Sequence, residues 1–129
     1  MVAAEDVELA RALERCEPPA TGFRHASHLR VAWVYLNESA TVDEALARMG
    51  ETLRRFAASV GHADKYSDRV TAFWMYQVAA VHAVMPSAAF DDMVRAYPWL
   101  LQKDLIASPP RAADPSGDPS DRAVSRRPA

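Results

Sequence analysis

Residues 23–36 read FRHASHLRVAWVYL, and this stretch decides the fold because its apolar residues recur at the spacing of an α-helix. An α-helix turns by about 100° per residue. With His25 set at zero, Leu29 lies about 40° away and His28 about 60° to the other side, whereas Val34 points away from both. We therefore expect one helix whose core-facing side carries two imidazoles.

These two histidines are the main indication of function. A buried polar group without a hydrogen bond costs of order 1 to 3 kcal/mol, so both rings need partners. Their i, i+3 spacing puts His25 and His28 within reach of one water, metal ion or substrate. Because imidazole titrates near neutrality, one ring could remove a proton while the other returns it. We predict a small-molecule enzyme in which His25 and His28 perform acid/base chemistry, such as an isomerisation, cyclisation or elimination.

Two other interpretations of the pair stay open. Both histidines could be structural, one donating to a carbonyl and the other to a tyrosine or carboxylate. They could also share a divalent metal, although a zinc or iron centre usually has three protein ligands. Further ligand candidates stand at no diagnostic spacing: His62, Asp64, Asp68, His82, Glu38 and Glu51. We expect no cofactor, with a single divalent metal on His25 and His28 as the alternative.

A second polar group, Lys65-Tyr66-Ser67-Asp68, precedes a long apolar segment. Lysine and tyrosine near the imidazoles could stabilise a developing negative charge, so Lys65 and Tyr66 join the predicted catalytic residues. The competing interpretation is an exposed helix start with an acid in its first turn. The residues expected to contact the substrate are Tyr35, Arg24, Trp74, Tyr76 and Asp68.

Helix signals recur along the rest of the chain. Thr41-Val42-Asp43-Glu44 is a capping box, in which the threonine hydroxyl and the glutamate satisfy free amides reciprocally, and Gly61 supplies a left-handed residue after the helix. Ser87 is expected to cap the last helix. No segment alternates as a half-buried strand would. The predicted helices cover residues 5–15, 21 or 22 to 37, 42–60, a start within 63–67 to 84, and 87–97.

The arrangement predicted from these helices is a compact antiparallel all-α bundle of about five helices, occupying residues 1–107. Apolar residues cover nearly the whole circumference of the helix ending at residue 84, which predicts that it lies at the centre. Residues 108–129 are rich in proline, serine and opposite charges, which is typical of a disordered tail.

Composition narrows the classes of partner and location. The chain has 129 residues and a formal charge of −2, so neither nucleic acid nor a membrane is an expected partner. Its single cysteine cannot form an internal disulfide, and acids stand near the N-terminus where a signal peptide would be basic. We expect a cytoplasmic protein. The absence of Walker, GxGxxG and nucleophile-elbow motifs argues against the large nucleotide-binding and hydrolase classes.

The same residues carry a resemblance. FRHASHLRVAWVYL, the following EALARMGETLRRFAASVG, the Lys65-Tyr66 pair and YPWLL at 97–101 resemble a family of small, uncharacterised bacterial all-helical proteins. The resemblance spans residues 23–101, rests mainly on FRHxxHLxxAW, and implies no particular activity. The family pattern has a histidine after the Lys-Tyr pair, where this chain has Ser67. If the relatives use three histidines for a metal or a proton relay, this chain lacks one of them.

A function other than catalysis is the remaining alternative. The bundle could bind another protein, or a second copy of itself as a homodimer, through exposed Trp99, Leu100 and Leu101. The histidines would then be structural residues of the core. The two classes differ in one structural feature, namely whether an open cavity reaches the imidazoles.

Overall fold

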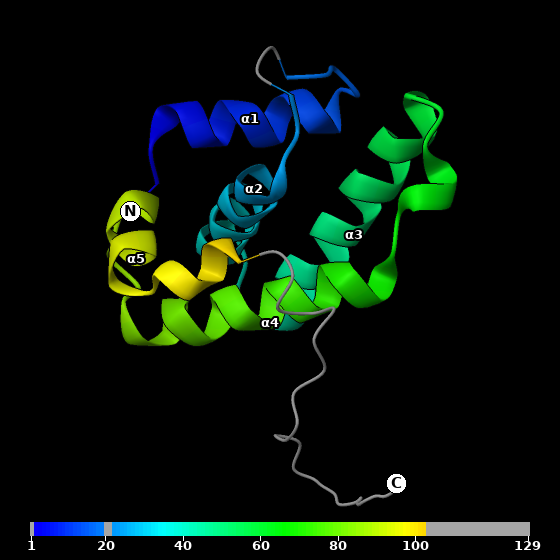
Figure 1. Cartoon of the computed structure of the whole chain (residues 1–129). Coiled ribbons are helices and arrows are strands. Elements are labelled where there is room, and N and C mark those ends of the chain that lie inside the picture. The colour runs from blue at the N-terminus through cyan, green and yellow to red at the C-terminus, as the bar shows by residue number, and fades with distance from the viewer. Residues whose placement is uncertain (1, 20–21, 103–129) are drawn as a thin grey trace, which may run out of the picture.

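Helices account for all the regular structure in the part of the chain that the structure describes. This computed structural model describes residues 2–19 and 22–102, so the domain end predicted at residue 107 and the tail predicted at 108–129 lie outside it. Figure 1 shows α1 (Ala4–Glu14), α2 (His25–Glu38), α3 (Val42–Ser59), η1 (Ala63–Lys65), α4 (Asp68–Val84), α5 (Phe90–Ala96) and η2 (Pro98–Leu101). The predicted all-α fold is confirmed, with no strand among these described residues.

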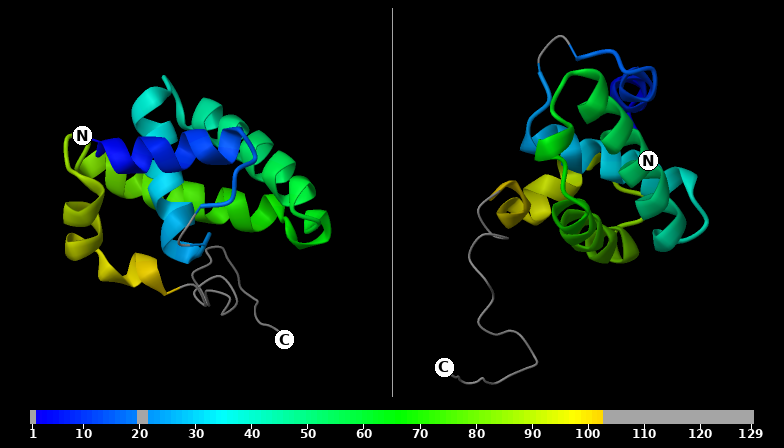
Figure 2. Two further views of the ribbon diagram at one scale, coloured as in Figure 1. Left: turned by 90° about the horizontal axis from the view of Figure 1, so that it is seen from above. Right: turned by 90° about the vertical axis from the view of Figure 1, so that its right-hand side faces the viewer.

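Helix α2 occupies the centre of the fold. Its residues 31–36 are all buried, and it packs against α1, α3 and α4. In the right-hand view of Figure 2, α1 and α4 are seen end-on, on opposite sides of α2. The prediction that α4 is central was wrong. Tyr76 and Val84 of α4 are 49% and 69% exposed, because no other described element covers this face of the helix.

Ion pairs as well as apolar contacts hold α1 and α5 against the side of α2 that carries Arg30. Arg30 donates to Asp6 of α1 at 2.9 Å and to Asp91 of α5 at 3.1 Å. Its guanidinium also lies 4.4 Å from the centre of the Phe90 ring. Because α1 and α5 cover this side, Val34 is fully buried, although the helical count alone predicted that it points away from the core seam.

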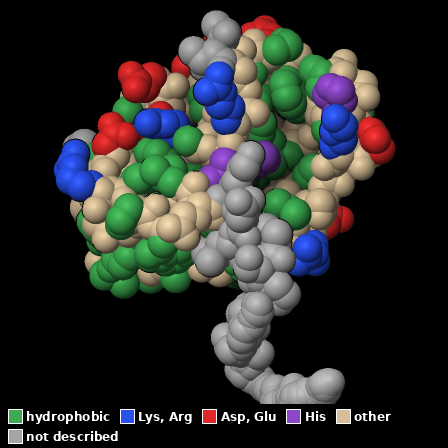
Figure 3. Space-filling view, viewed as in Figure 1, with side chains coloured by type: hydrophobic (Ala, Val, Ile, Leu, Met, Phe, Trp, Pro, Cys, Tyr) green, Lys and Arg blue, Asp and Glu red, His purple; other side chains and the backbone are tan. Residues whose placement is uncertain are grey.

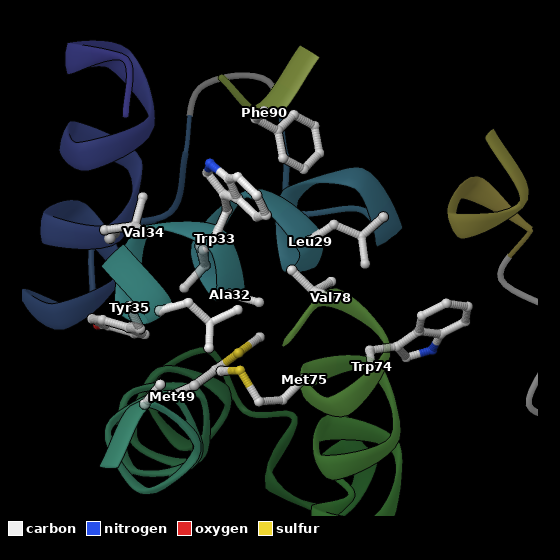
Figure 4. Packing of buried hydrophobic residues seen from close by; sticks show 14 of the residues in the cluster. Leu29, Ala32, Trp33, Val34, Tyr35, Met49, Trp74, Met75, Val78 and Phe90 are labelled. Atoms are coloured by element: carbon white, nitrogen blue, oxygen red, sulfur yellow. The ribbon is translucent and has the colours of Figure 1, made fainter. Parts of the chain in front are cut away.

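The core is filled by large side chains from α2, α3 and α4 (Figure 4). Met49 of α3 and Met75 of α4 point toward one another below α2, and both are fully buried. Trp33 lies on the side nearer Phe90, and its indole nitrogen donates to the carbonyl of Ala88 at 3.3 Å. Truncating one such buried side chain to alanine typically costs about 2 to 5 kcal/mol, so this packing holds α2 firmly in place.

The ends of α3 follow the predicted chemistry closely. Thr41 Oγ1 accepts the backbone N–H of Glu44 at 3.1 Å, as expected for the cap. The Glu44 carboxylate accepts the N–H of Ala40 at 3.0 Å, so the return bond is displaced by one residue from the expected box. Gly61 has φ +79°, which confirms the left-handed residue after the helix.

Two other helix starts differ from the prediction. The expected start of α2 at residue 21 or 22 was wrong, because Gly22 has φ +85°, which is incompatible with a right-handed helix, and α2 begins at His25. Ser87 does not cap α5, which begins at Phe90 without a side-chain cap. Ser67, in contrast, caps α4 by accepting a backbone N–H at 3.2 Å.

Candidate functional site

The two histidines of α2 line an open cavity of about 640 Å³. We call it the histidine pocket and define it by its lining residues, which are Phe23, Arg24, His25, Ala26, His28, Val70, Trp74 and Leu101. These residues come from the first turn of α2, from α4 and from η2. Figure 3 shows histidine side chains near the centre of one face of the molecule, bordered by hydrophobic groups. The volume lies within the range of about 300 to 1,000 Å³ that small-molecule sites usually have.

His25 connects the start of α2 to η2. Its Nε2 lies 2.8 Å from the carbonyl oxygen of Leu100. A carbonyl can only accept, so Nε2 carries the proton, and in the neutral ring Nδ1 is left as the acceptor. The ring also meets Trp74 edge to face, with 4.5 Å between centroids. One nitrogen therefore has a structural partner, while the ring still forms part of the pocket wall.

His28 lies one turn further along the same side of α2. Its ring contacts Phe23 edge to face at 4.5 Å between centroids. Burial lowers the pKa of His28 to about 4, and the nearby charge of His25 acts in the same direction. His28 is therefore a neutral imidazole near pH 7, able to accept a proton and rarely holding one to donate.

Two of the expected substrate contacts, Arg24 and Trp74, line the histidine pocket. Two others, Tyr35 and Tyr76, do not. The Tyr35 hydroxyl donates to Glu14 at 2.6 Å and lies 2.9 Å from Thr52 Oγ1, and burial raises its pKa to about 12. Tyr35 follows His28 by seven residues, which places it about 10 Å further along the helix axis. Counting about 100° per residue gave the direction of the Tyr35 side chain around the helix, but not its distance from His28 along the helix axis. Tyr76 is about half exposed on α4.

Lys65 and Tyr66 lie in a neighbouring cavity of about 300 Å³, which we call the lysine cavity. Its wall includes Phe23, His28, Phe56, His62, Lys65 and Tyr66. Because His28 and Phe23 line both cavities, the structure brings His28 near Lys65 and Tyr66, while His25 lines only the histidine pocket.

The hydroxyl of Tyr66 lies near a different helix from the two histidines. It lies beside α3, where a Cβ added to Gly50 would be 3.3 Å from it, and burial raises the pKa of this phenol. Asp68, another expected substrate contact, lines a third cavity of about 280 Å³ with Tyr66 and forms an ion pair with Arg54 at 3.0 Å. The structure therefore separates Asp68 and the Tyr66 hydroxyl from the histidine pocket.

Sequence reasoning missed several residues of the pocket wall. Val70 and Leu101 carry no chemical signal, and they reach the pocket only because α4 and η2 pack beside the start of α2. Phe23 and Ala26 belong to the quoted motif, and their nearness to the histidines in sequence could have identified them. Nothing in the local sequence connects Leu101 to His25, because their nearness depends on a contact between distant segments.

The residues of the histidine pocket do not make a metal centre by themselves. Within residues 2–19 and 22–102, no three side chains of the types His, Cys, Asp and Glu are grouped so that they could hold an ion. Nε2 of His25 is already hydrogen-bonded to the carbonyl of Leu100, and the hydroxyl of Ser67 caps α4. The described residues therefore supply no third ligand of these types beside the two histidines.

Comparison of the chain with protein-family models, with curated proteins and with solved structures gives no match. In the part of the chain that the structure describes, every helix is too short or too polar to cross a membrane. The case for function therefore depends on the geometry of the site.

Proposed function

We propose that this protein is an enzyme that transfers protons on a small organic molecule bound in the histidine pocket. The observation that supports this proposal is the position of His25 and His28, which come from successive turns of one buried helix and line the same open cavity. Apolar walls around two polar rings are typical of small-molecule sites. The proposal needs no metal, and it includes the expected cytoplasmic location and bacterial source, supported by the single cysteine and by the resemblance of the motif.

The two rings have different roles in this mechanism. His28 is neutral near pH 7, so it accepts a proton from the bound molecule, whose bonding electrons remain on the substrate as developing negative charge. His25 is held by Leu100 and lies beside the same ligand, where it orients the reacting group. Return of the proton to another atom of the ligand completes an isomerisation, and loss of a leaving group completes an elimination.

Proton abstraction has a direct spectroscopic signature. In D₂O, an enzyme that reversibly removes a proton from carbon exchanges it for deuterium, and the NMR signal of that proton disappears. We would incubate the native protein with mixtures of small metabolites and follow such losses. We expect exchange or conversion of at least one compound, strong loss of the activity in His28→Gln, and weaker activity in His25→Gln. His82→Gln is the matched control, because His82 lies in α4 outside the pocket wall.

The helical circular dichroism of each variant separates catalysis from folding. Activity that persists unchanged in both His25→Gln and His28→Gln would contradict the proposal. Loss of helix content in both variants would instead indicate structural histidines, as in the alternative interpretation.

An interaction surface is the second candidate, favoured by the exposure of Trp99 and Leu101. These side chains are 36% and 47% exposed on η2, whereas Leu100 is fully buried, which corrects its expected place on that surface. Leu100 is buried because its side chain packs into the hydrophobic core. If this surface forms a homodimer, sedimentation at increasing protein concentration should show association, and Trp99→Ser should abolish it.

A further inference from the structure

Among the described residues, the charge that lines the histidine pocket is positive. The described lining residues include the cation Arg24 and no aspartate or glutamate. Arg24 directly precedes the first turn of α2, so the partial positive charge at the start of the helix adds to that of the guanidinium. The remaining wall is apolar or aromatic except for the two imidazoles. A bound molecule therefore meets positive charge at one end of the pocket and apolar surface elsewhere.

Arg24 differs from most other arginines that the structure describes because it forms no ion pair with any carboxylate of residues 2–19 and 22–102. A carboxylate lies within 4.0 Å of each of the arginines 11, 15, 30, 48, 54, 55 and 95. Arg24 and Arg69 form no such pair with a described residue. Of these two, only Arg24 lines the histidine pocket. A guanidinium beside a cavity, with no described carboxylate bound to it, can bind a carboxylate or phosphate through two parallel hydrogen bonds.

The apolar part of the wall suggests what the rest of the ligand must be. Trp74, almost fully buried, has its ring held in place by His25 at 4.5 Å and by Phe73 at 5.0 Å between centroids. Val70 and Leu101 extend this apolar surface. A small inorganic anion would leave these walls in contact with water, whereas burial of an apolar group against them is favourable.

We infer that the ligand of the histidine pocket is a small organic anion, whose charged group binds Arg24 and whose apolar body lies against Trp74. The inference rests on the proposed function and names its substrate class. It also gives the reaction a direction, because an anchored carboxylate or phosphate would hold the neighbouring carbon atoms near His28, where a proton can be removed. Arg24 is then the residue that determines specificity for charge.

The test compares two probes that differ mainly in charge, 1-naphthoate and its neutral amide, 1-naphthamide. Binding to the full chain is followed by NMR shifts of the tryptophan indole signals, with the Trp74 signal assigned by its absence in Trp74→Phe. We expect naphthoate to bind at least about tenfold more tightly than the amide, as one charge-assisted contact to arginine would give. Arg24→Gln should remove this preference, and Arg69→Gln, the matched unpaired arginine, should keep it. Inorganic phosphate should bind far more weakly than naphthoate.

Other results would overturn the inference. Equal affinity for the two probes, equal loss of preference in Arg24→Gln and Arg69→Gln, or no binding of naphthoate would show that the pocket does not select organic anions. Phosphate binding as tight as that of naphthoate would overturn the role of the apolar wall. These measurements need no turnover, so they are independent of the deuterium-exchange test, and failure of either can be recognised separately.

Discussion

Replacement of His28 by glutamine should weaken the dependence of stability on pH. The pKa of His28 is lowered from its ordinary value of 6.5 to about 4, mainly by burial. Between these values the unfolded chain holds a proton that the folded chain does not. Acid therefore favours the unfolded state in this window, and the stability contributed by the neutral ring is lost as the pH falls from about 6.5 to about 4.

The size of the effect follows from the same two values. A difference of about 2.5 pKa units corresponds to about 3.4 kcal/mol over the whole window, at about 1.36 kcal/mol per unit. At about pH 5 the unfolded chain is almost fully protonated at this site and the folded chain almost fully neutral, which gives about 2 kcal/mol. The lost contact with Phe23 also destabilises the variant, but equally at both pH values, and so cancels in the comparison.

Urea unfolding followed by circular dichroism, at about pH 7.5 and about pH 5, measures this difference. Between about pH 7.5 and about pH 5, we expect the free energy of unfolding to fall by about 2 kcal/mol more in the native protein than in His28→Gln. NMR titration of the His28 ring in the native protein gives its pKa directly, and it decides the matter even if the variant folds poorly. Equal losses in both proteins, or a measured pKa near 6.5, would refute the argument that burial keeps this ring neutral.

Further predictions concern stability. Thr41→Ala should cost about 1 kcal/mol, because it leaves the N–H of Glu44 without its cap, and urea unfolding measures it. Asp6→Ala should cost about 3 kcal/mol, because it leaves half-buried Arg30 without its buried partner, whereas Asp91→Ala, on the exposed partner of the same arginine, should cost less than about 1 kcal/mol. Equal costs for the two aspartates would show that burial does not set the strength of this pair.

Local features of the chain were predicted well from sequence. The cap at Thr41 and the left-handed Gly61 depend on chemistry within a few residues, and both are present. The side-by-side placement of His25 and His28 also depends only on helix geometry, and both rings line one pocket. The start of α5 was misplaced at Ser87, because a good capping residue stands three positions before the helix that forms.

Features that join distant segments could not be predicted in the same way. The apolar character of α4 indicated that it is buried, but only packing shows that α2 is the helix covered on all sides. Tyr35 points to the expected flank of α2, yet its distance along the helix brings it to Glu14 and Thr52 instead of the histidines. The helical count gives directions around an axis, and it says nothing about which neighbour lies in each direction.

The sequence by itself determined that this chain folds into helices and that one helix presents two imidazoles on the same side. Helical periodicity and capping are local, because they depend on bond geometry and on hydrogen bonds over three or four residues. The tertiary structure alone decided that η2 returns to hold His25, that Val70 and Leu101 complete the pocket, and that Arg24 lines it without pairing with a carboxylate of the described residues. The hydrogen bond between His25 and Leu100 joins residues 75 positions apart, and such contacts form because folding buries apolar surface from several helices at once.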